Sequence, residues 1–194
     1  MLAQQLEAIA RASRESGAET WVMAPMISTP AEAAEFAGLA RDAGLGTVGV
    51  MVEIPSAALQ AEEILAEVDF VSIGTNDLAQ YAMATDRQAP GLGGLQDPWQ
   101  PAVLRLLGMV GRAGGRAGKP VGVCGEAAAD PALAAVLVGL GVTSLSMALR
   151  ALEPVRRALA RVTVEDCRRA AEAALASGDP AAARESVSRI LSTE

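Results

Sequence analysis

Five short apolar runs are spaced along the chain, and longer stretches with the period of amphipathic helices separate them. Because these runs are continuously apolar, we expect strands that are buried on both faces. The predicted strands cover residues 21–26, 47–52, 68–73, 120–124 and 144–147. Strands that alternate with helices at intervals of about 25 residues indicate βαβ units and a parallel sheet.

The predicted helices follow the same alternation, and proline and glycine mark several of their ends. They cover residues 2–16, 30–43, 56–67, 78–85, 101–117 and 131–140, with two or three more between 153 and 193. A complete eight-stranded barrel takes about 250 residues, whereas this chain has 194 residues and begins with a helix. We therefore predict an α/β fold, a partial TIM (β/α)8 barrel with about strands 4–8 and the first three strands missing. Residues 1–194 would form a single partial barrel domain, with residues 161–194 as its C-terminal helices.

The composition narrows the classes of function. With a formal net charge of −7, the chain lacks the clustered Lys and Arg that a nucleic-acid surface needs. No apolar stretch reaches the roughly 18 residues of a membrane span, and two distant cysteines without metal-like spacing favour a reducing cytoplasm. The sequence contains no histidine. A step that needs an imidazole must therefore take it from another polypeptide or domain.

Polar side chains follow the second and third predicted strands, at the ends where parallel strands present chemistry. Glu53 follows the second strand, and Asn76 and Asp77 follow the third. An ionised carboxylate beside a buried strand is costly unless it is paired or binds a metal. Glu53 could instead be an acid at a helix start, and Asn76 or Asp77 could cap the next helix. Together, the two carboxylates suit one Mg²⁺, which takes one or two carboxylates plus substrate oxygens and water.

Two further residues suit an anionic substrate. Cys124 ends the fourth strand before Gly125. Without a neighbouring histidine, its thiol is a better proton donor than nucleophile. The alternative is an inert buried thiol. Arg87 has the planar guanidinium that binds phosphate bidentately. A solvated loop arginine would give the same sequence signal.

These motifs together resemble the PEP-binding domain of Enzyme I, the phosphoenolpyruvate (PEP)–protein phosphotransferase of the bacterial sugar phosphotransferase system, in the superfamily of PEP-utilising enzymes. The resemblance covers essentially the whole chain. It is carried by Met51-Val-Glu-Ile-Pro-Ser56, Val68-Asp-Phe-Val-Ser-Ile-Gly-Thr-Asn-Asp-Leu-Ala-Gln-Tyr81, Thr85-Asp-Arg87, Gly122-Val-Cys-Gly-Glu126 and Leu145-Ser-Met147.

The resemblance implies a role for each candidate residue. Glu53 and Asp77 would hold Mg²⁺, and Asn76, Asp77 and Arg87 would contact PEP. Cys124 would be the proton donor to the enolate carbon when pyruvate forms. The phosphoryl group would pass to a histidine on an N-terminal domain outside this chain and on to a phosphocarrier protein, in a cytoplasmic homodimer.

Two alternatives remain open at this stage. Pyruvate phosphate dikinase and PEP synthase carry similar motifs, so the chain could be a piece of one of them. A partial barrel with exposed sheet edges could also be a dimerisation module without turnover. Because this chain would carry only the metal, enolate and acid half of the site, we expect it to be inactive in isolation.

Overall fold

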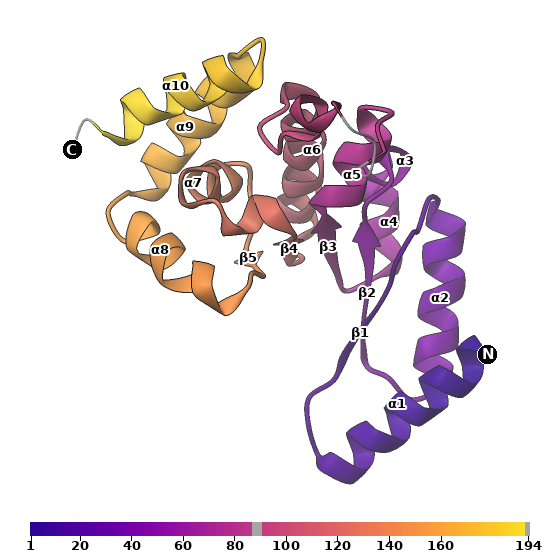
Figure 1. Ribbon diagram of the computed structural model, residues 1–194. Coiled ribbons are helices and arrows are strands. Elements are labelled where there is room, and N and C mark those ends of the chain that lie inside the picture. The colour runs from indigo at the N-terminus through magenta and orange to yellow at the C-terminus, as the bar shows by residue number, and fades with distance from the viewer. Residues whose placement is uncertain (87–90, 193–194) are drawn as a thin grey trace.

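The computed structural model describes residues 1–86 and 91–192. Within them, parallel strands form one sheet in which the spatial order follows the chain order (Figure 1). The strands are β1 (Trp21–Ala24), β2 (Thr47–Val52), β3 (Phe70–Gly74), β4 (Val121–Cys124) and β5 (Ser144–Leu145). Alternation of these strands with helices gives the predicted partial barrel, with open edges at β1 and β5.

The helices lie between and after the strands. They are α1 (Leu2–Ser16), α2 (Pro30–Asp42), α3 (Pro55–Leu59), α4 (Ala61–Glu67), α5 (Thr75–Ala82), α6 (Pro101–Ala117), α7 (Pro131–Gly139), α8 (Leu149–Leu159), α9 (Val164–Ala176) and α10 (Pro180–Leu191), with the short 3-10 helices η1 (Gly93–Gln96) and η2 (Glu126–Ala129).

Local signals explain most helix boundaries. The predicted bounds 2–16 and 101–117 are confirmed, and both helices end at a glycine in the left-handed conformation. The predicted helix 56–67 is wrong as a single element: it breaks at Gln60, whose φ of −108° and ψ of 28° are not helical. The Gln60 side-chain amide donates to the carbonyl oxygen of Ser56 at 3.2 Å, so the break has a local polar partner.

The expectation that all five strands are buried is wrong for the edge strands β1 and β5. On β5, Ser144 is exposed and Leu145 is half-buried. Trp21 and Met23 on β1 are 53% and 43% exposed, because β1 lies at an edge of the sheet and pairs with β2 alone among the described strands. The Trp21 ring packs against Phe70 of β3, with ring centroids 4.9 Å apart. The intervening Gly49 of β2 leaves room for this pair, since a Cβ there would lie 2.5 Å from the Phe70 ring.

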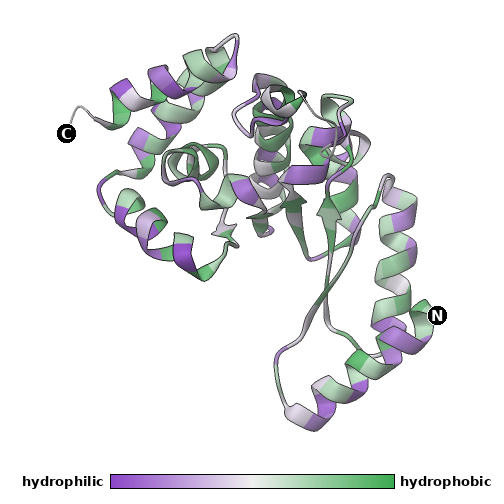
Figure 2. Ribbon diagram, viewed as in Figure 1, coloured by the Kyte–Doolittle hydropathy of each residue, from purple (hydrophilic) through white to green (hydrophobic). Residues whose placement is uncertain are grey.

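The core lies between the sheet and the helices that follow its strands. Val48, Val71 and Ile73 are fully buried, and α2, α4 and α6 contact one another in sequence along the sheet. Figure 2 shows hydrophobic colour on the strands at the centre of the sheet, and alternating hydrophobic and hydrophilic bands along the outer helices. Among the described helices, none is both long enough and apolar enough to cross a membrane.

Candidate functional site

The register of the sheet brings the predicted site residues to one edge. Val52 of β2 is level with Ile73 of β3, and Gly74 is level with Cys124 of β4. Glu53, which follows Val52, therefore lies beside Gly74 in the same layer as Cys124. Asn76 and Asp77 lie in the first turn of α5, directly after β3, so they are not N-caps. The structure thus gathers Glu53, Asn76, Asp77 and Cys124 at the carboxyl ends of three neighbouring strands, and Arg87 lies outside the described residues.

Glu53 is a buried carboxylate with 4% of its surface exposed. Its Oε1 accepts a hydrogen bond of 2.7 Å from the backbone N–H of Met26, in the segment that follows β1. Met26 has a φ of 59°, a conformation that costs of order 1–3 kcal/mol for a residue with a side chain. No Lys or Arg forms an ion pair with Glu53 within residues 1–86 and 91–192. A buried carboxylate with a single hydrogen-bond donor still needs a cation or further donors.

Gly74 makes room for that carboxylate. A Cβ at this position would lie 2.5 Å from Glu53 Oε2 and 2.9 Å from Glu53 Cβ. The glycine of the Gly-Thr-Asn-Asp motif is therefore required by close approach between two strand ends.

A set of contacts joins the ends of β3 and β4. The Thr75 hydroxyl, which is buried, donates to the carbonyl oxygen of Cys124 at 2.9 Å. Gly125 has a φ of 94°, and a Cβ there would lie 2.7 Å from Thr75 Oγ1. The backbone N–H of Glu126 donates to Asn76 Oδ1 at 3.4 Å. These contacts hold the half-buried Cys124, whose Sγ lies 3.5 Å from the carbonyl oxygen of Ile73.

The donor set fits a hard cation only if a substrate completes it. Within the described part of the chain, no cluster of three or more His, Cys, Asp and Glu side chains could hold a metal ion. Mg²⁺ does not need such a cluster, because it commonly binds one or two carboxylates together with substrate oxygens and water. Glu53 and the half-buried Asp77 supply carboxylates of this kind on adjacent strand ends.

A polar cavity of about 420 Å³ adjoins the site, and sequence reasoning missed much of its wall. Its lining includes Thr75 and Asn76 of α5, and also Asp97 and Arg184. Arg184 comes from α10, more than 100 residues after Asn76 in the sequence. No sequence pattern that we identified pairs Arg184 with Asp97, because the contact is formed only in the folded chain.

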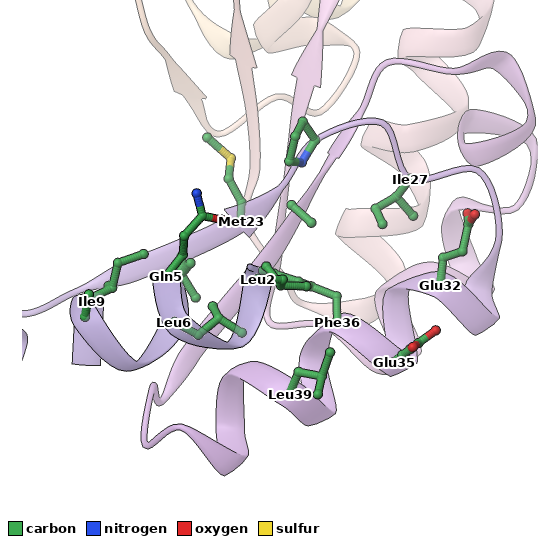
Figure 3. Close-up of a pocket in the computed structure, with 14 residues that line it drawn as sticks. Leu2, Gln5, Leu6, Ile9, Met23, Ile27, Glu32, Glu35, Phe36 and Leu39 are labelled. Carbon is green, nitrogen blue, oxygen red and sulfur yellow. The ribbon is translucent and has the colours of Figure 1, made fainter. Parts of the chain in front are cut away.

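A second hollow, of about 770 Å³, lies away from these residues and is mainly apolar. Figure 3 shows Leu2, Leu6 and Phe36 among the side chains of α1 and α2 that surround it beside β1. Its Glu32 carboxylate accepts hydrogen bonds from the backbone N–H groups of Ser28 and Thr29, which hold the pKa of Glu32 below its ordinary value. That carboxylate serves the capping box of α2. Gln5 and Glu35 are the other polar side chains of the lining, so most of the wall is apolar.

Comparisons with known proteins agree with this arrangement. The sequence profile of the family described as PEP-utilising enzyme, PEP-binding domain, matches residues 1–164. The chain is 52% identical to a phosphoenolpyruvate-protein phosphotransferase of Streptomyces coelicolor, over 100% of this chain and 35% of that protein. It is 39% identical to one of Bacillus subtilis, over 84% of this chain and 30% of that protein. The chain therefore spans about one third of the length of these curated relatives.

The fold also resembles a solved structure of a citrate lyase from Burkholderia xenovorans. The superposition has a TM-score of 0.60 and 21% sequence identity, and it covers 98% of this chain and 67% of that one. At this level of identity the likeness concerns the fold alone.

Proposed function

We propose, from the premise that this chain belongs to the PEP-utilising enzymes through their PEP-binding domain, that it binds PEP with Mg²⁺ for phosphoryl transfer to a histidine outside residues 1–194. The observation that carries the proposal is Glu53, a buried carboxylate with no cationic partner among the described residues, level with Cys124. Asp77 follows on the adjacent strand end. This arrangement supports a site for a cation and an anionic substrate.

Each residue has a role in this proposal. Glu53 and Asp77 bind the cation, which neutralises charge on the phosphoryl oxygens when it is bound. Asn76 donates its side-chain amide to PEP, and Arg87 pairs with the phosphate. As the phosphoryl group passes to the histidine, the bond between phosphorus and the enol oxygen of PEP breaks, and its electron pair stays on the enolate. The Cys124 thiol then delivers its proton to the enolate carbon to form pyruvate. Phosphoryl transfer depends mainly on positioning and charge neutralisation, which these groups can supply.

The relatives favour a phosphotransferase over a dikinase or PEP synthase, since both of those reported above are named phosphoenolpyruvate-protein phosphotransferases. The phosphohistidine domain, a phosphocarrier protein, a homodimer and a cytoplasmic location are part of the same proposal. Because the chain spans about one third of these relatives, we expect PEP binding without turnover in the isolated chain. The exposed edge strand β1 is the feature on which the alternative of a dimerisation module rests.

The test is a calorimetric titration of PEP into this chain with and without Mg²⁺. Glu53→Gln keeps an oxygen that can accept from Met26 but removes the charge, and Asp77→Asn makes the matching change on α5. Loss of one metal ligand should weaken Mg²⁺-dependent PEP binding by about 100-fold or more. The reason is that mutation of a residue that only supports a metal ligand already lowers metal affinity by about 10–100-fold. Cys124→Ser should leave PEP binding within about twofold, because the thiol acts only in proton transfer.

Glu63→Gln is the control, because it removes one charge from an exposed position on α4. Equal PEP affinity with and without Mg²⁺ would exclude the metal role of Glu53 and Asp77. A folded wild-type chain that binds no PEP at millimolar concentration would exclude the substrate assignment for this chain.

A further inference from the structure

Arg184 joins the C-terminal helix to the wall of the polar cavity. It lies on α10, beyond residues 1–164 that the family profile matches. Its guanidinium donates to both carboxylate oxygens of Asp97, each at 2.7 Å, and lies 5.4 Å from the centroid of the Trp99 ring. A bidentate pair stacked on an aromatic ring fixes direction as well as distance.

The electrostatics agree with a persistent pair. Partial burial would raise the pKa of Asp97, but the hydrogen bonds from Arg184 and the Trp99 backbone lower the pKa below its ordinary value. The same hydrogen bond to Asp97 raises the pKa of Arg184. The Asp97 side chain is 23% exposed and that of Arg184 is 45% exposed, so the pair is partly screened by water and its value lies in its bidentate geometry.

Further hydrogen bonds extend this contact into the core. Asp97 Oδ1 also accepts from the backbone N–H of Trp99 at 2.9 Å. The buried Trp99 donates through Nε1 to Asp130 at 2.9 Å, and Asp130 caps the N-terminus of α7. The segment from η1 to Trp99 is therefore held between α7 and α10.

The held segment forms part of the wall of the cavity that Asn76 also lines. Gly93, Gln96 and Asp97 line the cavity together with Asn76. The hydrogen bond that Asn76 accepts from the backbone N–H of Glu126 is 3.4 Å long, longer than the usual length of about 2.9–3.0 Å. Gln96 Nε2 is buried without a hydrogen-bond partner among the described residues, so the wall retains a donor for an oxygen atom. The α5 helix, which carries Asn76, contacts η1, so the wall lies against the element on which Asn76 sits.

We propose that Arg184 is a positioning residue for the PEP site: it clamps Asp97 so that the segment 93–98 holds Asn76 in the orientation that binds substrate. The proposal rests on the function proposed above. It assigns a part in substrate binding to α10, which does not itself contribute to the strand ends.

The test compares Arg184→Gln and Asp97→Asn with Arg189→Gln, which removes a charge from an exposed position on the same helix. Hydrogen exchange of the full 194-residue chain measures the segment 91–100, and NMR measures the Asn76 side-chain amide. Calorimetry measures PEP affinity in the presence of Mg²⁺. Arg184→Lys distinguishes a bidentate clamp from a simple charge.

We expect Arg184→Gln and Asp97→Asn to speed exchange at 91–100 by at least tenfold, to shift the Asn76 amide signal and to weaken PEP binding by about five- to tenfold. Arg184→Lys should behave like Arg184→Gln in exchange rate, Asn76 signal and PEP affinity. Arg189→Gln should change none of these three quantities. Unchanged exchange or an unmoved Asn76 signal in Arg184→Gln overturns the proposal, as does unchanged PEP affinity in a wild-type chain that binds PEP. If the wild-type chain binds no PEP, the proposed function fails, and the Asn76 signal still decides the positioning role.

Discussion

Replacement of Gly74 by alanine tests the packing at the centre of the candidate site. The added Cβ would lie 2.5 Å from Glu53 Oε2 and 2.9 Å from Glu53 Cβ, with Met51 Cε at 3.1 Å. The Glu53 carboxylate has little room to move, because the side chain is 4% exposed and Met26 holds its other oxygen at 2.7 Å. The substitution must therefore shift the carboxylate, the strand or both.

The expected loss of stability follows from these contacts. Overpacking a tight site costs about 1–3 kcal/mol, and a hydrogen bond to a charged group contributes about 1.5–3 kcal/mol. Since the displaced carboxylate can regain some hydration, we expect Gly74→Ala to lower the free energy of unfolding by about 2–4 kcal/mol. For a chain of this length, each kcal/mol lowers Tm by roughly 2–4 °C, which gives a drop of roughly 4–16 °C.

Thermal and urea unfolding measure this loss, and Gly115→Ala provides the matched control. Gly115 lies on α6, and a Cβ there meets nothing within 4 Å, so alanine should raise stability by up to about 1 kcal/mol through helix propensity. The Mg²⁺-dependent rise in Tm in the presence of PEP should also disappear in Gly74→Ala and persist in Gly115→Ala.

A double-mutant cycle with Glu53→Ala identifies the contact responsible. If the Glu53 carboxylate opposes the new methyl group, Gly74→Ala should cost at least about 1 kcal/mol less in the Glu53→Ala background. The reasoning would be refuted if Gly74→Ala and Gly115→Ala had equal effects, or if the two substitutions at Glu53 and Gly74 were additive.

Two further predictions concern α9. The hydrogen bonds from Thr163, followed by the one from Arg169, lower the pKa of Asp166 from 3.8 to about 2. Because its pKa is lower in the folded state, ionised Asp166 stabilises the folded chain at pH values above its pKa in the unfolded chain. The difference in free energy of unfolding between wild type and Asp166→Asn should therefore shrink as pH falls from about 4 to 2. A difference independent of pH in urea titrations would contradict this. Burial, followed by the charge of Asp166, raises the pKa of Cys167, and this residue is 2% exposed. A thiol reagent should therefore label the half-buried Cys124 at least tenfold faster than Cys167 in the native chain. Equal labelling rates would contradict the burial of Cys167.

Much of the fold could be predicted from local signals. Proline at residues 30, 101 and 131 marks the first turns of α2, α6 and α7, and these helices begin where predicted. The exposure of the edge strands β1 and β5 could not be predicted, because an apolar run does not reveal whether a strand has one neighbour or two. The break at Gln60 was also missed, since the helical pattern continues through it.

The candidate site was predicted only in part. The motifs at strand ends placed Glu53, Asn76 and Cys124 together, because parallel strands in chain order bring their carboxyl ends to one edge. The backbone N–H of Met26 carries no signal of side-chain type, so its hydrogen bond to Glu53 could not be foreseen. Arg184 was missed for a different reason, since its partner is 87 residues away in sequence.

The positions of the two tryptophans give the molecule two separate optical reporters. Trp21 is 53% exposed on β1, whereas Trp99 is 1% exposed beneath Arg184. Trp21 should emit at longer wavelength and be quenched by acrylamide, so its fluorescence will report on the open edge of the sheet. Trp99 should emit at shorter wavelength and report on the contact with α10. Because the sequence contains only these two tryptophans, Trp21→Phe and Trp99→Phe separate the signals. Coverage of the edge by another polypeptide and release of the C-terminal helix can then be followed independently in one sample.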